Sequence, residues 1–295
     1  MRIDPKEIPV PKLHGYFLSA VAPRPIAFAS TVDEDGNVNL SPFSFFNVFS
    51  TNPPILIFSP ARRGRDNTTK HTLENVKVHA EVVINIVNHD MVEQMSLAST
   101  EYPKGVDEFI KSGFTKEASE KVQPPRVAEA PVSFECKVRE VIALGDSGGA
   151  GNLVICEVLL MHVKDEILDS EGRIDPQLID QVARMGGDWY TRAKLGTFEV
   201  AKPLTTIGIG YDAIPAAIRN SPILTGNHLG KLGNVEQLPT EEEISALGSE
   251  PEVMAILTGL DGDPDQQQLE LHKLAAICLD KGQVMDAWKI LLQPI

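Results

Sequence analysis

Apolar and β-branched runs alternate with turn-forming segments through the first two thirds of the chain. Residues 23–32, 38–49 and 53–60 are such runs, and the Asp35-Gly36 step after the first is a hairpin signal. Three more runs follow at 81–87, 132–144 and 152–168. The pattern predicts a mainly β domain that opens with an antiparallel meander.

Helical spacing is confined to short segments of this region. Residues 68–76 predict a helix with threonines available to cap its start, and MVEQMSLAST (91–100) predicts a second short helix. Residues 101–130 are polar, contain prolines and lack strong periodicity. They predict a long loop, and loops of that length are often functional.

The composition changes near residue 196, and helix signals follow further on. Thr240 and Glu243 have capping-box spacing, while Asp263 and Pro264 are suited to the cap and first position of a longer helix. Gly282 then predicts a break between two helices. We therefore expect a domain over 1–195 and a C-terminal extension over 196–295, helical from about residue 239, with its last two helices packing on the first domain or on a second subunit.

Charge and composition exclude several classes of function. The chain has 41 acidic and 27 basic residues, a net charge of −14, which disfavours nucleic acid and anionic membranes as partners. No stretch approaches the ~18 consecutive apolar residues of a membrane span, and the first residues do not read as a signal or transit peptide. We expect a soluble, cytoplasmic protein. The three cysteines are far apart and fit neither a disulfide framework nor a metal motif, so no metal is predicted.

GDSGG (145–149) is how the nucleophile of a chymotrypsin-like protease is written, with Ser147 as the serine. That reading also needs a histidine base and a buried aspartate, and none of the seven histidines lies in a similar context. A glycine-rich run between two β segments is the ordinary composition of a turn. We therefore predict a hairpin connection, with Ser147 as a turn residue.

A basic segment stands out in this acidic chain. ARRGRDNTTK (61–70) contains three arginines and Lys70 against one aspartate. Such a patch suggests a small bound anion, although a solvated basic loop is the plain alternative. Lys70 and Thr72 at a helix start would hold a phosphate with the helix dipole behind them, and Arg63 or Arg65 could close over it.

Three motifs resemble one known family. They are R-P-x-A-x-x-S-T-V-D-x-x-G-x-x-N-x-S-P-F-S-F-F from Arg24 to Phe46, N-P-P at 52–54, and K-x-T-x-x-N from Lys70 to Asn75. Together they resemble the flavin reductase-like family of FMN-binding split barrels, over roughly residues 10–195. The chain departs from the family pattern at His71, where aspartate is common.

The resemblance implies a mainly β fold: an FMN-binding split β-barrel with short helices, here with a helical C-terminal extension. It implies an oxidoreductase in which NAD(P)H delivers a hydride to bound FMN, which then reduces a second flavin, oxygen or another small acceptor. A homodimer is implied as well. No catalytic side chain is predicted, because the flavin itself accepts the hydride.

Bound FMN needs apolar faces for its ring, polar groups for the ring edge, and cations with helix N–H groups for its phosphate. The first domain supplies all three. Phenylalanines in a core and hydroxyls bonded to backbone are the alternatives for the strand residues. The predicted cofactor contacts are Ser30, Thr31, Asn39, Ser41, Ser44, Phe45, Phe46, Asn47, Ser59, Arg63, Arg65, Lys70 and Thr72.

MGGDWYTR (185–192) joins Trp189, Tyr190 and Arg192 after two glycines. The cluster could line a pocket for substrate or nicotinamide, or it could be an aromatic plug at the end of the barrel. Two other functions stay open. The protein could be a flavoenzyme acting on another organic substrate, or a non-catalytic FMN-binding or carrier protein with an interaction tail.

Overall fold

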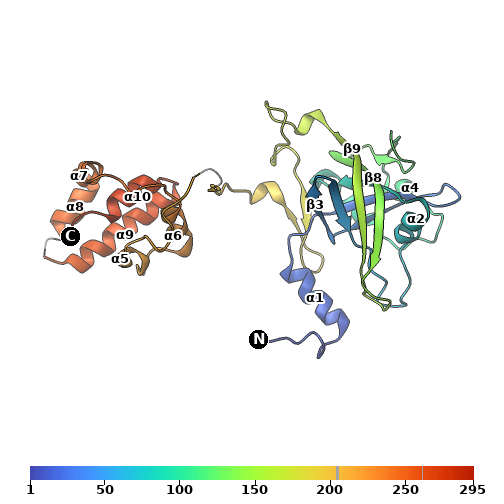
Figure 1. Cartoon of the computed structure of the whole chain (residues 1–295), viewed down its shortest axis with the longest axis horizontal. Coiled ribbons are helices and arrows are strands. Elements are labelled where there is room, and N and C mark those ends of the chain that lie inside the picture. Colours follow the sequence, from blue (N-terminus) through green and yellow to red (C-terminus); the bar gives the residue numbers. More distant parts are fainter. Residues whose placement is uncertain (204–205, 261) are drawn as a thin grey trace. The chain divides into compact units, whose positions relative to one another are not determined.

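The computed structural model describes residues 1–203, 206–260 and 262–295. The chain divides into two compact units, Met1–Phe198 and Glu199–Ile295, called unit 1 and unit 2 below (Figure 1). Unit 1 is built around a large antiparallel sheet, and the regular elements in the described part of unit 2 are helices. The predicted β domain and C-terminal helices are therefore confirmed.

The sheet of unit 1 has seven strands in the order β2-β1-β5-β8-β9-β4-β3. The strands are β1 (Ala27–Val32), β2 (Val38–Phe43), β3 (Phe46–Thr51), β4 (Pro54–Phe58), β5 (Glu81–Ile86), β8 (Val132–Ala143) and β9 (Asn152–Val163). β2 and β3 stand at opposite edges, so the predicted continuous meander over 23–60 is wrong. The reason is long-range pairing: β1 also pairs with β5, and β4 also pairs with β9.

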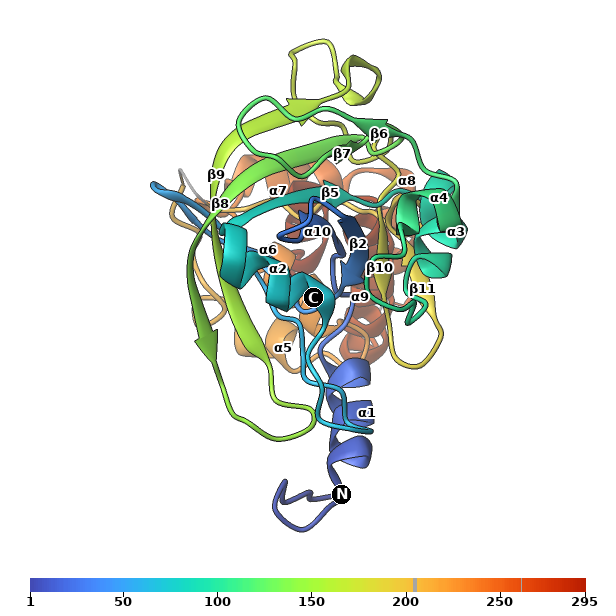
Figure 2. The ribbon, with the colours of Figure 1, turned by 90° about the vertical axis from the view of Figure 1, so that its right-hand side faces the viewer.

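Side chains alternate across the sheet and build two cores. Ala27 and Ala29 of β1 lie in one core with Leu73 and Val76 of α2 (His71–His79). Phe28 lies in the other, with residues of α3 (Val92–Leu97) and α4 (Glu108–Ser112). Figure 2 shows α2 in the hollow of the curved β8–β9 ribbon, and α3 and α4 on the other side of the sheet.

The short elements of unit 1 differ in part from the prediction. The helix expected at 91–100 is present as α3, but residues 101–130 are not one loop, because α4, β6 and β7 lie within them. α4 has five residues and is capped by Asp107, too short for a periodic pattern to show. The remaining elements are α1 (Val10–Ala20), η1 (His89–Met91), β6 (Lys116–Glu117), β7 (Arg126–Val127), η2 (Asp165–Ile167), β10 (Val182–Arg184), β11 (Tyr190–Arg192) and η3 (Ala193–Leu195).

α2 begins one or two residues later than a cap at Thr69 or Thr68 would require. Its N-cap is Lys70, which makes no side-chain capping bond. The threonines are engaged elsewhere, since Thr68 Oγ1 donates to Asp66 Oδ1 (2.6 Å) and Thr69 Oγ1 donates to Glu74 Oε1 (2.7 Å). Capping of this helix by threonine is therefore wrong.

GDSGG (145–149) lies in the connection between β8 and β9. β8 and β9 pair antiparallel as far as Ala143 and Asn152, so the hairpin prediction is confirmed. Ser147 lies in the connecting loop, and its Oγ contacts Asp146 Oδ1 at 3.3 Å. Its neighbours are those of a turn residue.

Unit 2 packs its helices around Trp288, whose side chain is fully buried. The capping box at Thr240 and Glu243, the Asp263 cap and the break at Gly282 are all present. Helical structure starts at Ala216 and not near residue 239: α5 has only four residues, too few for a periodic pattern, and α6 contains three glycines. The helices are α5 (Ala216–Arg219), α6 (Gly226–Gly233), α7 (Glu241–Gly248), α8 (Pro251–Gly259), α9 (Pro264–Asp280) and α10 (Val284–Leu291).

The three cysteines are free, and Cys136 and Cys156 are buried in the sheet core. Across the described residues, no helix combines the length and apolar character needed to cross a membrane.

Candidate functional site

Three cations of the basic segment converge on one carboxylate beside the start of α2. Arg63 Nε and Lys70 Nζ lie 2.8 and 3.1 Å from Glu101 Oε1, and Arg65 Nη2 lies 2.9 Å from Glu101 Oε2. Hydrogen bonds from Arg63 and Lys70 lower the pKa of Glu101 to about 2. The segment therefore builds a site that surrounds one anionic group with positive charge.

The glycine-rich β8–β9 loop supports this basic segment. Arg62 N donates to Ala150 O (2.8 Å), and Gly149 N donates to Arg62 O (3.0 Å). A Cβ atom on Gly148 would lie 3.1 Å from Arg63 O, so a side chain there would push the segment away. GDSGG thus shapes the cationic site, a role that its sequence did not suggest.

Two polar pairs fix α2 to the sheet. Asn39 Nδ2 donates to Thr72 Oγ1 (2.9 Å), and Asn75 Nδ2 donates to Thr31 Oγ1 (3.0 Å). Thr31 and Asn39 are register partners on β1 and β2, so the two bonds lie side by side. Thr31 and Thr72 are buried, and their hydroxyls hold the helix in place.

Ser30 is separated from this group by strand alternation. It neighbours Thr31 on β1 and therefore points to the opposite face of the sheet, the face of Phe28 and Leu40. Ser30 is fully buried, and within the described part of the chain its Oγ has no hydrogen-bond partner. The structure does not bring Ser30 to the same surface as Thr31 and Asn39.

The SPFSFF turn joins β2 to β3 beside α1. Phe45 is partly exposed, and its ring meets the His14 ring edge-on at a centroid distance of 6.1 Å. Ser59 N donates to Phe45 O (2.8 Å), while Ser59 Oγ accepts from Asn152 N (3.1 Å). The turn therefore lies next to the segment that leads into the basic loop.

The other residues predicted around this turn have separate surroundings. Ser41 is half-buried on the strand face of Asn39, and Phe46 packs against the sheet core. Asn47 is exposed, and its Oδ1 accepts from Val48 N (2.8 Å). Of these three, Ser41 and Phe46 lie on the side of the sheet that α2 covers.

Arg24 is a buried cation that the sequence reasoning did not assign to the site. Its guanidinium donates to the carbonyl oxygens of Leu18, Val21 and Met185, and Nε lies 3.4 Å from Ser44 Oγ. Burial and nearby Arg184 lower its pKa, and no described carboxylate pairs with it. The R-P pair at the start of β1 was the available signal.

The β10–β11 hairpin carries the predicted substrate residues, which are not in the lining of the cavity beside it. A cavity of about 400 Å³ lies beside it, and its lining includes Thr191 and Ala193. Tyr190 and Arg192 alternate with these residues and so face the other way. Tyr190 Oη accepts from Arg184 Nη1 (2.9 Å), and Trp189 is 77% exposed.

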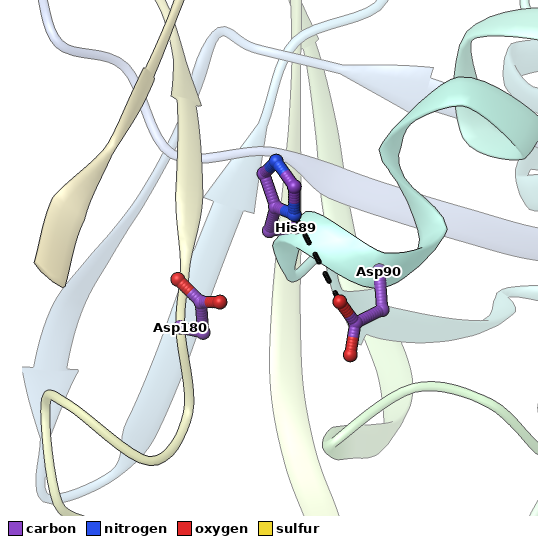
Figure 3. A group of neighbouring side chains, drawn as sticks. All are labelled: His89, Asp90 and Asp180. Carbon is purple, nitrogen blue, oxygen red and sulfur yellow. Dashed lines mark ion pairs between the residues drawn. The ribbon is translucent and has the colours of Figure 1, made fainter. Parts of the chain in front are cut away.

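Arg192 is held by Asp180, at 2.9 Å between Nε and Oδ1. Figure 3 shows Asp180 near His89 and Asp90. The distance between His89 Nδ1 and Asp90 Oδ1 is 3.8 Å. Lys194 Nζ also lies 2.8 Å from Asp180, and the hydrogen bonds from Arg192 and Lys194 hold the pKa of Asp180 far below its ordinary value. Protein cations already neutralise the buried member of this His-Asp-Asp group.

Solved structures of similar fold include the following three proteins. Component B of nitrilotriacetate monooxygenase from Bacillus cereus has a TM-score of 0.64 and 27% identity, covering 68% of this chain and 98% of that one. A 2-nitrobenzoate 2-nitroreductase from Pseudomonas fluorescens has a TM-score of 0.62 and 25% identity, and the match covers 71% of this chain and 100% of that one. A Shewanella frigidimarina protein described as a flavin reductase with a split barrel domain has a TM-score of 0.57 and 28% identity. That match covers 68% of this chain and 98% of the other.

These proteins are matched over almost their whole length, so about 30% of this chain has no counterpart in them. The model of the flavin reductase like domain matches residues 19–181, which lie entirely within unit 1. That match covers more than half of the chain and confirms the resemblance carried by its motifs. The chain therefore belongs to the flavin reductase like domain family, and unit 1 is the domain of a flavin-related oxidoreductase.

Proposed function

We propose that unit 1 binds FMN and catalyses flavin reduction by NAD(P)H. The observation that carries this proposal is the convergence of Arg63, Arg65 and Lys70 on one anionic group beside the start of α2. A phosphate monoester is an anion that suits such a cluster, because it accepts several charge-assisted hydrogen bonds at once. FMN carries one, and riboflavin does not.

The neighbouring residues fit the rest of the cofactor. Phe45 offers a partly exposed apolar ring, and Ser41 and Ser44 offer hydroxyls near it. Arg24, buried behind Ser44, adds positive charge on that side, which would favour electron density on the flavin. Bound FMN would supply the redox chemistry by accepting a hydride from the reduced nicotinamide.

The protein's own part in this reaction is alignment. Thr31, Asn39, Thr72 and Asn75 keep α2 and its cations fixed on the sheet, so the phosphate end of the cofactor would be held in one position. A fixed cofactor lets a second ring stack against it at reacting distance. We also expect the sheet to close as a split barrel and the chain to form a homodimer, as the family resemblance implies.

A second candidate is a flavoenzyme that reduces an organic substrate directly. It is favoured by the 25% identity to a 2-nitrobenzoate 2-nitroreductase and by the apolar cavity of about 400 Å³ beside the β10–β11 hairpin. The cavity is large enough for a small aromatic molecule. The two candidates share FMN and differ in the molecule that receives the electrons.

The first test is the visible spectrum of the purified full-length protein after FMN is added and excess is removed. Retained flavin bands, release of FMN on denaturation and bleaching by NADH or NADPH would support the proposal. Acceptors would then be compared under steady-state conditions, with free flavin, oxygen and nitroaromatic acids offered separately. Retained FMN without turnover of either nicotinamide would leave a carrier role, and a protein that neither retains FMN nor quenches its fluorescence at equilibrium would reject the proposal.

A further inference from the structure

Glu101 is the centre of the cationic site and comes from a distant part of the chain. It lies 31 residues from Lys70 and 38 from Arg63, in the segment between α3 and α4. Its two carboxylate oxygens together receive Arg63, Arg65 and Lys70 at 2.8–3.1 Å. The carboxylate therefore stands in the position that a bound phosphate would take.

The charge balance argues against both anions staying in place. The three cations face Glu101 and Asp66, which leaves one net positive charge. A phosphate monoester has a charge of about −1.5 to −2 near neutral pH. With Glu101 displaced, the cluster and a phosphate come close to neutrality, whereas with Glu101 present they carry excess negative charge and like-charge repulsion.

Glu101 is also free to move away. Its side chain is 39% exposed, and no helix or strand includes its backbone. Its partners Arg65 and Lys70 are 72% and 30% exposed, and ion pairs at the surface typically contribute below about 1 kcal/mol each; Arg63, at 15%, is the less accessible partner. Rotation of the Glu101 side chain into solvent therefore costs little more than the loss of these ion pairs. A bound phosphate would give the three cations equivalent ion pairs.

We propose that Glu101 is an internal competitor for the phosphate site: its carboxylate occupies the Arg63, Arg65 and Lys70 cluster and must leave when FMN binds. This inference rests on the proposed FMN site and adds what sets its affinity. Glu101 weakens FMN binding while keeping the cation cluster compact in its absence. A cofactor that exchanges readily, and not one held permanently, is the consequence.

The test measures the dissociation constants of FMN and riboflavin for the full-length apoprotein by flavin fluorescence quenching. Glu101→Gln and Glu101→Ala should each tighten FMN binding by at least about threefold. Riboflavin binding should not change, because riboflavin has no phosphate. Glu117→Gln is the matched control: Glu117 also pairs with an arginine on unit 1, Arg126, and the change should leave both constants unaltered.

The outcomes separate the two proposals. Equal or weaker FMN binding by both Glu101 variants, with wild-type FMN binding intact and folding unchanged by circular dichroism, would overturn the inference and make Glu101 a support for the cations. Equal tightening of FMN and riboflavin would overturn it too, because the effect would lie away from the phosphate. Failure of the wild-type protein to bind either flavin would reject the FMN site itself and the inference with it.

Discussion

Unit 1 and unit 2 differ in what they bury. Unit 1 buries charged groups, and Arg24, Glu108 and Glu135 are each at most 5% exposed. In the described residues of unit 2 the buried polar side chains are His228, Gln267, His272 and Gln293, around an apolar core that contains Trp288. Buried charge needs partners and is costly to keep, so its concentration in unit 1 marks the part of the molecule built for chemistry.

Glu135 shows how unit 1 makes buried charge tolerable. Its carboxylate accepts from the backbone N–H of Glu120 (2.9 Å) and contacts His162 Nε2 at 2.7 Å. Burial raises the pKa of Glu135, but these hydrogen bonds outweigh it, so the pKa is lowered. Unit 2, in contrast, is held together mainly by packing of apolar side chains.

The largest expected effect is a loss of unfolding free energy confined to unit 2. Trp288→Ala removes a fully buried side chain and leaves Leu232 O without the bond from Trp288 Nε1 (3.1 Å), so unit 2 should lose about 3–5 kcal/mol of unfolding free energy. Urea unfolding followed by circular dichroism measures the loss. Trp189→Ala, at a 77% exposed position, is the control and should change little. Loss of flavin retention in the Trp288 variant would contradict the assignment of the site to unit 1.

The next effect concerns the cations of unit 1. Lys70→Ala should weaken FMN binding about tenfold or more, since one charge-assisted hydrogen bond to the phosphate is lost. Combining it with Thr72→Ala, which frees Asn39 from α2, should weaken binding further. Lys77→Ala, at the exposed far end of the same helix, is the matched control. An equal effect of Lys70→Ala and Lys77→Ala in a dialysis assay would show that the phosphate lies elsewhere.

A smaller effect tests the support given by the β8–β9 loop. A Cβ at Gly148 would meet Arg63 O at 3.1 Å and Gly64 Cα at 3.2 Å, so Gly148→Ala must shift the basic segment. We expect FMN affinity to fall by about 1 kcal/mol, or about fivefold. Gly64→Ala is the control, because a Cβ atom at Gly64 would have no neighbour within 4 Å. Unchanged affinity in the Gly148 variant would reject this role of the glycine loop.

The smallest expected effect is a pH dependence of stability that differs between the two units. Burial lowers the pKa of His272 below its ordinary 6.5, so the unfolded chain binds a proton that the folded chain does not. Unit 2 should therefore lose stability, by at most about 1 kcal/mol, as pH falls below 6.5. Glu101 in unit 1 has the depressed pKa of a paired carboxylate, so its contribution is present above pH 4.5 and is lost only as pH falls from there toward 2.

Tryptophan fluorescence can follow unit 2 by itself, because Trp288 lies there and the chain's other tryptophan is Trp189. In a Trp189→Phe background, the urea midpoint of the Trp288 signal should be lower at pH 5.5 than at pH 7.5. His272→Gln should reduce that difference. A pH-independent midpoint in the background protein would contradict the role given to His272.

Much of the site could be predicted because its signals are local. Arg63, Arg65 and Lys70 lie within eight positions of one another, and the structure brings them to one anion. Glu101 could not be predicted, since it reaches the cluster from a segment without a periodic pattern. Tyr190 and Arg192 illustrate a different limit: the aromatic and cationic cluster was recognisable, but the β10–β11 pairing that decides which of its side chains face the cavity was not.

The sequence by itself determined the strand segments, the cation cluster, the helix caps at Thr240 and Asp263 and the family, because each depends on neighbouring residues. Tertiary structure decided the rest. The separation of β2 and β3 to opposite edges, the burial of Thr31 and Thr72 where α2 meets the sheet, and the contact of Gly148 with the basic segment all depend on which distant strands pair. Such pairing reflects burial summed over the whole sheet, a quantity that no short stretch of sequence contains.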